Sequence, residues 1–363
     1  MPIDKTKQDE IINLARDLMS IESTPNRPDM QIKCIDLICD KYQTVFKTFR
    51  FDIDGHPAVV LTNSNDLSSE VTFSGHIDVV SGEPQLFSPI IEDDRLSGRG
   101  AYDMKAAIAL YVVTAADYIK SGGQRKVAVV ITSDEETTGN GTRSLIEELG
   151  LKTNFAIICD GGTDTKIVTK QKGGLHVKIR LTGKSAHGAY PWRGDNPILK
   201  AFKLYEDLTR RFPEPTEYNQ WQTSVMLSRI ETSNSINQVP GEAYLYLDAR
   251  YIDPKDNNEI QSIIKNHVAS TGDIEILNEH KMFSTDTDNS YVKKLAQSMQ
   301  KFNSEKISYD VENGASDAVY FSLKDMPAAL FRPIGANLHQ SDEWVSIASL
   351  ENCFHVLLDF LTN

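Results

Sequence analysis

Apolar positions along the N-terminal part of the chain recur with the periods of helices and strands. Residues 7–20 have apolar side chains at Ile11, Leu14, Ala15 and Leu18, the stripe of an amphipathic helix. The run Val127–Thr132 is almost entirely apolar, as expected of a strand in a sheet covered on both faces. Further helices are predicted over 30–46, 105–119 and 141–149, and strands over 47–52, 57–62, 71–75 and 155–159. This alternation predicts an α/β fold, with a mostly parallel sheet and helices on both faces.

The pattern changes at about Gly173. From there the predicted order is strand, helix, strand, strand, helix, strand, over 174–182, 196–211, 223–231, 242–251, 256–270 and 273–279. This βαββαβ order is that of a ferredoxin-like split βαβ unit. Helices over 290–302 and 347–361, with a short strand over 328–331, resume the first pattern. We therefore expect an α/β domain formed by residues 1–172 and 283–363, interrupted by an inserted α+β domain, residues 173–282.

Composition narrows the classes of function. A chain of 363 residues is long enough for both domains. Its net charge of −13 argues against sequence-independent binding of nucleic acid, which needs a basic surface. The four cysteines form no CxxC pair, which favours free buried thiols and a reducing compartment. Residues 1–10 lack the apolar segment of a signal peptide, and no apolar run reaches the roughly 18 residues that span a membrane. We expect a cytoplasmic protein with no membrane or nucleic-acid partner.

The segment Ser74–Val80 places a histidine and an aspartate at the end of a predicted strand. In extended chain residues i and i+2 share a face, so His76 and Asp78 can lie side by side. A carboxylate beside a histidine is the usual support of a metal ligand, because it fixes the tautomer of the ring. The alternative is a histidine that is salt-bridged at a strand end and binds no metal.

Three further segments carry acidic residues beside predicted strands or helices. Asp103 follows a glycine-rich turn and precedes a helix, where it could bind metal or could be an N-cap. Glu135 and Glu136 follow Asp134 at the end of an apolar strand. Crowded carboxylates are costly unless a cation lies between them, so a metal is one explanation and a solvated acidic loop is the other. Asp160 ends another apolar strand.

The combination is more specific than any one segment. His339 follows a short strand near the C-terminus, and with the segments above it gives two imidazoles and three carboxylates near strand ends. The carboxyl ends of parallel strands form the ligand crevice of such sheets. The five ligands suit a pair of zinc ions bridged by one carboxylate, and such centres activate water and polarise a carbonyl. The predicted ligands are His76, Asp103, Glu136, Asp160 and His339.

Five blocks of the sequence together resemble the aminoacylase/carboxypeptidase/desuccinylase family of metallopeptidases. The blocks are Ser74–Val80, Gly98–Lys105, Thr132–Gly139, Gly183–Ile198 and Gly335–Glu343. They occur in the family's order over essentially the whole chain. The resemblance implies a zinc-peptidase fold in which the inserted domain is a lid that also dimerises.

The resemblance also implies roles for the predicted ligands. His76 and Asp160 would bind one zinc, Glu136 and His339 would bind the other, and Asp103 would bridge them and be followed by a cis peptide bond. Asp78 would orient His76, and Glu135 would be the general base that moves a proton from water to the leaving amine. The ligand set would also take Co²⁺ or Mn²⁺.

In the inserted domain the resemblance points to three more residues. His187 would enter the active site of a partner subunit and steady the oxyanion, which implies a homodimer. Asn237 would lie near the substrate, and Arg250 would grip the substrate carboxylate, since a guanidinium pairs bidentately with that group. His187 and Arg250 could instead be ordinary surface residues. Gly314 and Ser316, in a loop of the first domain, would also lie near the substrate carboxylate.

We therefore expect a dinuclear-zinc amidohydrolase that cleaves the amide bond of an N-acyl amino acid or of a short peptide with a free carboxylate. An alternative is succinyl-diaminopimelate desuccinylase, which residues 187–197 resemble, although Asp160 followed by Gly161 is more typical of aminoacylases and some peptidases. A metal-bound binding protein without turnover is a second alternative, against which the presence of Glu135 speaks. A serine hydrolase is disfavoured because the chain lacks a G-x-S-x-G elbow.

Overall fold

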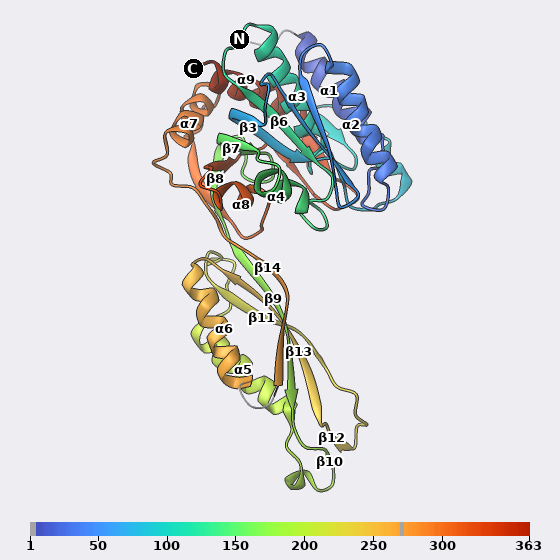
Figure 1. Ribbon diagram of the computed structural model, residues 1–363, viewed down its shortest axis with the longest axis vertical. Helices are drawn as coiled ribbons and strands as arrows, with labels where there is room; N and C mark the ends of the chain where they lie inside the picture. Colours follow the sequence, from blue (N-terminus) through green and yellow to red (C-terminus); the bar gives the residue numbers. More distant parts are fainter. Residues whose placement is uncertain (1–4, 269–271) are drawn as a thin grey trace. The chain divides into compact units, whose positions relative to one another are not determined.

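The computed structural model describes residues 5–268 and 272–363, which divide into two compact units (Figure 1). Unit 1 contains the chain up to Thr169 together with Ser284–Asp310 and Ser316–Asn363. Unit 2 contains Lys170–Phe283 and the short return Val311–Ala315.

Unit 1 is built on a mixed sheet whose central strands are parallel. The strand order is β1-β2-β6-β3-β7-β17-β8-β15, and β16 pairs with β8. The parallel strands are β6 (Val127–Thr132), β3 (Ser68–His76), β7 (Lys152–Ile158) and β17 (Ala328–Leu330). The flanking strands are β1 (Lys47–Ile53), β2 (His56–Thr62), β8 (Lys166–Gln171), β15 (Phe283–Ser284) and β16 (Ser308–Glu312). The parallel centre was predicted from the alternating pattern, whereas β2 and β8 join it in antiparallel pairs.

Helices cover both faces of this sheet because its central strands are apolar on both sides. In β6, Val127, Val129 and Ile131 belong to the core shared with the first group of helices, and the intervening Ala128 and Val130 are equally buried. The first group is α1 (Lys5–Met19), α2 (Pro28–Tyr42), α3 (Lys105–Lys120), α7 (Ser290–Phe302) and α9 (Ile347–Thr362). The short helices α4 (Asn140–Glu147) and α8 (Ala318–Ser322) contact each other and the strands β1, β7 and β17.

Some predicted bounds in unit 1 were wrong. The helix predicted over 30–46 ends at Tyr42, and in the turn that follows the amides of Val45 and Phe46 both donate to the Tyr42 carbonyl. Phe46 is still buried, so its apolar character marked the core and not the helix. A second small sheet, β18-β19-β5-β4, was not predicted because no strand in it exceeds three residues. Its strands are β4 (Ile90–Glu92), β5 (Arg95–Ser97), β18 (Gly335–Ala336) and β19 (Trp344–Ser346).

Unit 2 has the predicted βαββαβ order. Its antiparallel sheet runs β11-β13-β9-β14, with α5 (Pro197–Arg211) and α6 (Pro254–Val268) packed side by side on one face (Figure 1). The strands are β9 (Gly173–Thr182), β11 (Ser224–Glu231), β13 (Glu242–Tyr251) and β14 (Gly272–His280). The predicted helix over 256–270 is α6 as far as Val268, and residues 269 and 270 lie outside the described residues. The two-residue strands β10 (Ala186–His187) and β12 (Gln238–Val239) form a separate pair.

Buried and partly exposed side chains alternate along β9 and β13, and this alternation decides which side chains of unit 2 are not covered by the helices. Leu175, Val177, Ile179 and Leu181 of β9 face the helices and are buried. The residues between them lie on the opposite face, and β13 alternates in the same way, so Arg250 lies on the face that the helices leave open.

The four cysteines are free and buried, as predicted. Among the helices of residues 5–268 and 272–363, none has both the length and the apolar character needed to cross a membrane.

Candidate functional site

The carboxyl ends of the parallel strands bring the predicted metal ligands together. His76 is the last residue of β3 and pairs in register with Thr132, the last residue of β6. Glu135 and Glu136 follow in the turn after β6. Asp103 stands just before α3, which begins at Lys105 with Met104 as its N-cap residue, so Asp103 is not the N-cap. The Asp103–Met104 peptide bond is cis, as the resemblance implied.

Asp103 lies between two histidines. Its Oδ1 is 3.2 Å from His76 Nε2, and its Oδ2 is 3.1 Å from His339 Nε2. The same nitrogen of His339 lies 3.1 Å from Glu136 Oε1. Ligand atoms of His76, Asp103 and Glu136 all lie within 4.8 Å of one another. A carboxylate whose two oxygens face two different imidazoles has the arrangement of a bridging ligand.

Asp78 contacts two of the predicted ligands, His76 and Glu136. Its side chain is fully buried. The Nδ1 atom of His76 is 3.0 Å from the Asp78 carbonyl oxygen and 3.4 Å from its carboxylate Oδ1, and the backbone N–H of Glu136 donates to its Oδ2 at 3.0 Å. Asp78 therefore fixes the ring of His76 so that Nε2 faces Asp103.

Glu135 and Glu136 make contact with different histidines. Its Oε2 lies 3.9 Å from His76 Nε2, whereas Glu136 faces His339. Burial raises the pKa of Glu135 well above its usual value; His76 opposes the rise, and the negative charges of Asp160 and Asp317 add to it. A carboxyl group whose pKa is shifted upward toward neutral pH is suited to exchanging a proton with a neighbouring group.

The charges of this cluster do not balance without a further cation. In the described part of the chain, no Lys or Arg forms an ion pair with Asp103, Glu135 or Glu136, and their only such contacts are to His76 and His339. Burial acts to lower the pKa of His76, but Asp103 and Asp78 outweigh it and hold that pKa well above its usual value. The hydrogen bond with Asp103 is the main cause that raises the pKa of His339 to about 9.

This donor set fits a metal centre. Imidazole nitrogens and carboxylate oxygens are the ligands that zinc takes, and a divalent ion would replace the protons that bridge these groups. Asp160 is two residues beyond the end of β7 and outside the tight group, yet close enough to raise the pKa of Glu135. His339 has a φ of 63°, a left-handed conformation uncommon outside glycine and found at functional sites.

A buried ion pair that the sequence did not single out holds the backbone of two predicted ligands in place. Arg99 Nη1 donates to Glu343 Oε2 at 2.7 Å, and the two side chains are 3% and 1% exposed. Glu343 Oε1 accepts from the backbone N–H groups of Tyr102 and Asp103 at 2.8 and 3.0 Å. Arg99 Nη2 also reaches the His339 carbonyl at 3.4 Å. In the sequence, Arg99 precedes Asp103 by four residues and Glu343 follows His339 by four. Two opposite charges that flank predicted ligands at this spacing were the signal that could have predicted the ion pair.

In unit 2, two predicted residues from distant segments meet at the β10–β12 pair. His187 pairs with Gln238, and the Gly188 N–H donates to the Asn237 carbonyl at 2.6 Å. The Ala189 N–H donates to His187 Nδ1 at 3.1 Å. A neutral ring that accepts at Nδ1 carries its proton at Nε2, so exposed His187 presents a hydrogen-bond donor.

Arg250 is held rigidly on the open face of the sheet of unit 2. Its guanidinium pairs side-on with Asp248, through Nε at 2.8 Å and Nη2 at 3.2 Å. Nη1 and Nη2 also lie 3.3 Å from the Nε2 atoms of His280 and His176. A Cβ on Gly174 would come within 2.1 Å of His280 Nε2, so the glycine makes room for this ring.

Arg250 also lines a cavity of ≈ 350 Å³ within unit 2. Lys172 is a second cation in its wall, held by a 2.7 Å bond from Nζ to the Gln220 carbonyl, and Arg250 is one cause of its lowered pKa, after burial. Asn313, just before Gly314, completes this side of the cavity. Gly314 itself is exposed, and Ser316 is buried in unit 1, where its Oγ accepts from the Ala318 N–H.

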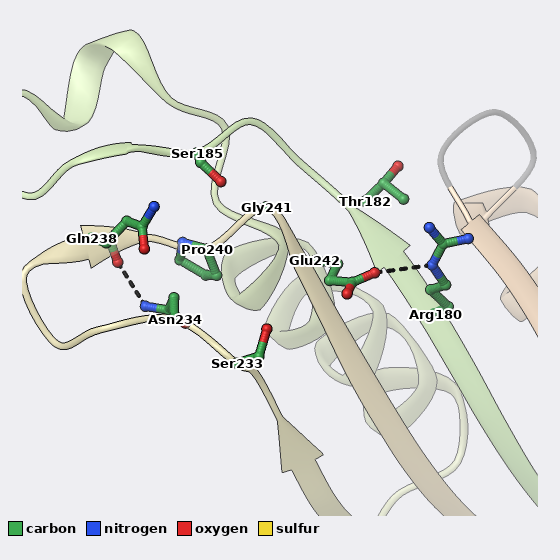
Figure 2. A pocket seen from close by; sticks show the side chains of 9 residues that line it. All are labelled: Arg180, Thr182, Ser185, Ser233, Asn234, Gln238, Pro240, Gly241 and Glu242. Carbon is green, nitrogen blue, oxygen red and sulfur yellow. Dashed lines mark hydrogen bonds and ion pairs between the residues drawn. The ribbon is translucent and has the colours of Figure 1, made fainter.

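A second cavity of unit 2, ≈ 340 Å³, carries no free charge (Figure 2). Arg180 is paired with Glu242 at 3.2 Å and with Asp273 at 2.9 Å, and Asn234 donates to the Gln238 carbonyl at 2.8 Å. The other lining residues are neutral: Thr182, Ser185, Ser233, Pro240 and Gly241. It therefore lacks the groups needed for amide hydrolysis.

Residues 72–363 match the Peptidase family M20/M25/M40, and this segment contains every predicted metal ligand described above. The chain belongs to this family. It is accordingly a metal-dependent hydrolase that acts on amide or peptide C–N bonds, as the sequence predicted.

Individual family members are similar over their whole length. A Rickettsia massiliae protein named succinyl-diaminopimelate desuccinylase is 26% identical, over 96% of this chain and 98% of that protein. The aminopeptidase PepT from Bacillus cereus has a TM-score of 0.83 at 17% identity, with 98% of each chain covered. The Bacillus subtilis YXEP protein, described as a dinuclear metal binding peptidase of the M20 family, has a TM-score of 0.73 at 14% identity over 99% of this chain and 98% of that one. The two structures confirm the predicted fold class.

Replacing Glu343 by glutamine should destabilise the protein by about 3–5 kcal/mol, because Arg99 would be left buried without a counter-ion. The measurement is urea unfolding of the metal-free protein. The matched control is Glu259→Gln, which breaks the exposed pair with Arg211 and should cost less than about 1 kcal/mol. Equal losses of unfolding free energy in the two variants would contradict a stabilising role of the buried Arg99–Glu343 pair.

The contribution of His339 to the stability of the metal-free protein should be lost as pH rises from 6.5 to about 9. The pKa of His339 is raised from 6.5 to about 9 in the folded state, so its contribution is fully present below pH 6.5 and is lost as pH rises through 9. The test compares unfolding free energies of the native protein and His339→Gln across this range. The difference cancels other titrating groups, such as Lys105, whose pKa burial lowers to about 8. A difference that stays constant with pH would be contrary to this expectation.

Proposed function

We propose that this protein is a dinuclear-zinc amidohydrolase that cleaves an N-acyl amino acid or a short peptide with a free carboxylate. The observation that carries the proposal is the placement of Asp103 between His76 and His339, with Glu135 beside them. His76 and Asp160 would hold one ion, His339 and Glu136 the other, and Asp103 both. Zinc ions held there would supply Lewis acidity, which lowers the pKa of water and polarises a carbonyl.

Glu135 is the proposed general base. Its raised pKa suits a carboxylate that takes a proton from the attacking water and then gives it to the departing amine nitrogen. The same proton is therefore carried from one side of the scissile bond to the other. Asp78 contributes by keeping His76 in place, and the Arg99–Glu343 pair does the same for Asp103 and His339.

The lid residues are proposed to bind the substrate. Arg250 would take the free carboxylate, and its bidentate pair with Asp248 supports this role because the fork is already oriented. Lys172 and Asn313, in the same cavity, would add positive charge and a hydrogen-bond donor. Asn237, Gly314 and Ser316 remain proposed neighbours of the substrate.

We further propose that unit 2 forms a homodimer through which His187 reaches the partner's active site. Its exposed Nε2 donor suits a developing oxyanion. Leu199 and Phe202 of α5 are 66% and 54% exposed, an apolar surface that a second copy would cover. Strands β11 and β14 are the sheet edges, which offer further pairing.

A second candidate is succinyl-diaminopimelate desuccinylase. It is favoured by the name of the Rickettsia relative, at 26% identity over nearly the whole chain. Zinc-dependent release of amine from N-acetyl and N-succinyl amino acids, N-succinyl-diaminopimelate and dipeptides would separate the candidates.

Glu135→Gln should lower kcat by about 100- to 10,000-fold while metal remains bound, because the variant cannot transfer the proton. Amine release and metal content by atomic absorption are measured together. The control is Glu92→Gln on the exposed strand β4, which should match the native rate. Substantial turnover by the metal-loaded Glu135→Gln variant would show that Glu135 is not the general base.

Mixing His187→Ala with Glu135→Gln should restore activity if His187 acts in trans. A mixed dimer then has one complete site, so about one quarter of the native rate should return after subunit exchange. Each variant alone is the control, and light scattering gives the oligomeric state. Absence of restoration in verified mixed dimers would show that His187 does not act across subunits.

A further inference from the structure

Lys105, the first residue of α3, is a fully buried lysine that donates to backbone carbonyls. Its Nζ is 2.9 Å from the carbonyl oxygen of Leu18 and 2.5 Å from that of Ile21. A Cβ on Gly100 would come within 2.9 Å of Lys105 Cδ, so the glycine leaves room for the side chain to reach these carbonyls. Because burying an ammonium group is costly, this placement calls for a reason beyond the packing of α3.

The two carbonyls belong to residues 18–24, where α1 ends and the chain turns (the α1 turn). The last carbonyls of a helix have no partner within the helix, and a positive charge is favourable beside them. The Ile21 N–H donates to the Leu18 carbonyl at 3.1 Å, and the Ser23 N–H donates to the Ile21 carbonyl at 2.9 Å. The ammonium of Lys105 therefore holds both carbonyls around which the α1 turn folds.

The α1 turn is in turn bonded to the chain on both sides of Asp78. Ser23 is fully buried, and its Oγ donates to the Ile77 carbonyl at 2.6 Å. The Val79 N–H donates to the Ser23 carbonyl at 3.2 Å. These bonds fix the backbone that carries Asp78, whose side chain and carbonyl contact the ring of His76.

Lys105 thus joins two segments that carry predicted ligands. It follows Asp103 by two residues at the start of α3, and through the α1 turn it is connected to the segment of His76. The two ligands are close, with His76 Nε2 3.2 Å from Asp103 Oδ1. The spacing between them is set by how α3 and the end of β3 are held against each other.

We infer that Lys105 is a positioning residue of the proposed metal centre, which sets the spacing of His76 and Asp103 through the α1 turn. This rests on the proposed function, in which these two residues bind the same ion. Lys105 touches neither the ion nor the substrate, and its effect is transmitted by Ser23 to the backbone around Asp78.

The test is Lys105→Met, a side chain of similar length without hydrogen-bond donors. It leaves two buried carbonyls short of a donor, so the α1 turn should shift and the ligands should move apart. The affinity for zinc, measured by competition with a chromophoric chelator, should fall by about 10- to 100-fold, the range for residues that orient metal ligands. The visible absorption of the Co²⁺-loaded protein should also change, because it reports the ligand geometry.

Ser23→Ala tests the same connection at its other end. This variant loses the bond to the Ile77 carbonyl and retains both bonds of Lys105. It should also lower the zinc affinity, and the double variant with Lys105→Met should lose less than the sum of the two single losses, because both act through one path.

The matched control is Thr62→Val. Thr62 is also buried, and its Oγ1 donates to a carbonyl of unit 1, that of Val127 at 2.8 Å. Val127 is the first residue of β6, at the end of the strand opposite the predicted ligands. The zinc affinity and the Co²⁺ absorption of this variant should match those of the native protein.

A folded Lys105→Met variant with native zinc affinity and native Co²⁺ absorption would overturn the inference. If that variant does not fold, native values for Ser23→Ala would overturn it, as would an equal fall of affinity in Thr62→Val. A native protein that binds zinc but cleaves none of the amides would overturn the proposed function and leave the role of Lys105 to be decided by these affinities.

Discussion

The organisation of unit 1 depends on bringing several carboxylates to one edge of a sheet. Asp78, Asp103, Glu135 and Glu136 are largely buried and lie around His76, although like charges in such a place repel each other. Two histidines compensate part of this charge, and their pKa values are raised as a result. A divalent cation at the proposed centre would compensate more of it, and the free energy stored in assembling the site would then become affinity for metal.

Residues outside the ligand set keep this arrangement in place against repulsion. Asp78 bonds to both the ring of His76 and the backbone of Glu136, and Glu343 bonds to the backbone of Asp103. Burial raises the pKa of Glu343 even though it accepts from two N–H groups and from Arg99, so its charge is held at a cost. These contacts join chain segments that are far apart in sequence, which makes ligand geometry a property of the whole unit.

In unit 2, the alternation of side chains along the strands decides which polar groups remain exposed. The period of two in β9 and β13 buries one row of side chains under α5 and α6 and leaves the other row uncovered. Arg250, His176 and Asp248 all stand in the uncovered row, where they pair with one another. The helices thus stabilise the sheet while its polar face remains available for a ligand.

The sequence by itself predicted the long elements and the residues proposed to hold metal. Long periodic segments such as α1, β6 and β9 were predicted because side-chain periodicity is a local property. His76, Asp103 and Glu136, which lie close enough together to hold a metal ion, were predicted because each stands beside a strand end or a helix start. Tertiary structure decided what local patterns cannot encode, namely that Arg99 pairs with Glu343 and that Arg332 stacks on Tyr102. Partner choice between charged side chains depends on distances set by chain segments more than a hundred residues apart, and no spacing along the sequence measures them.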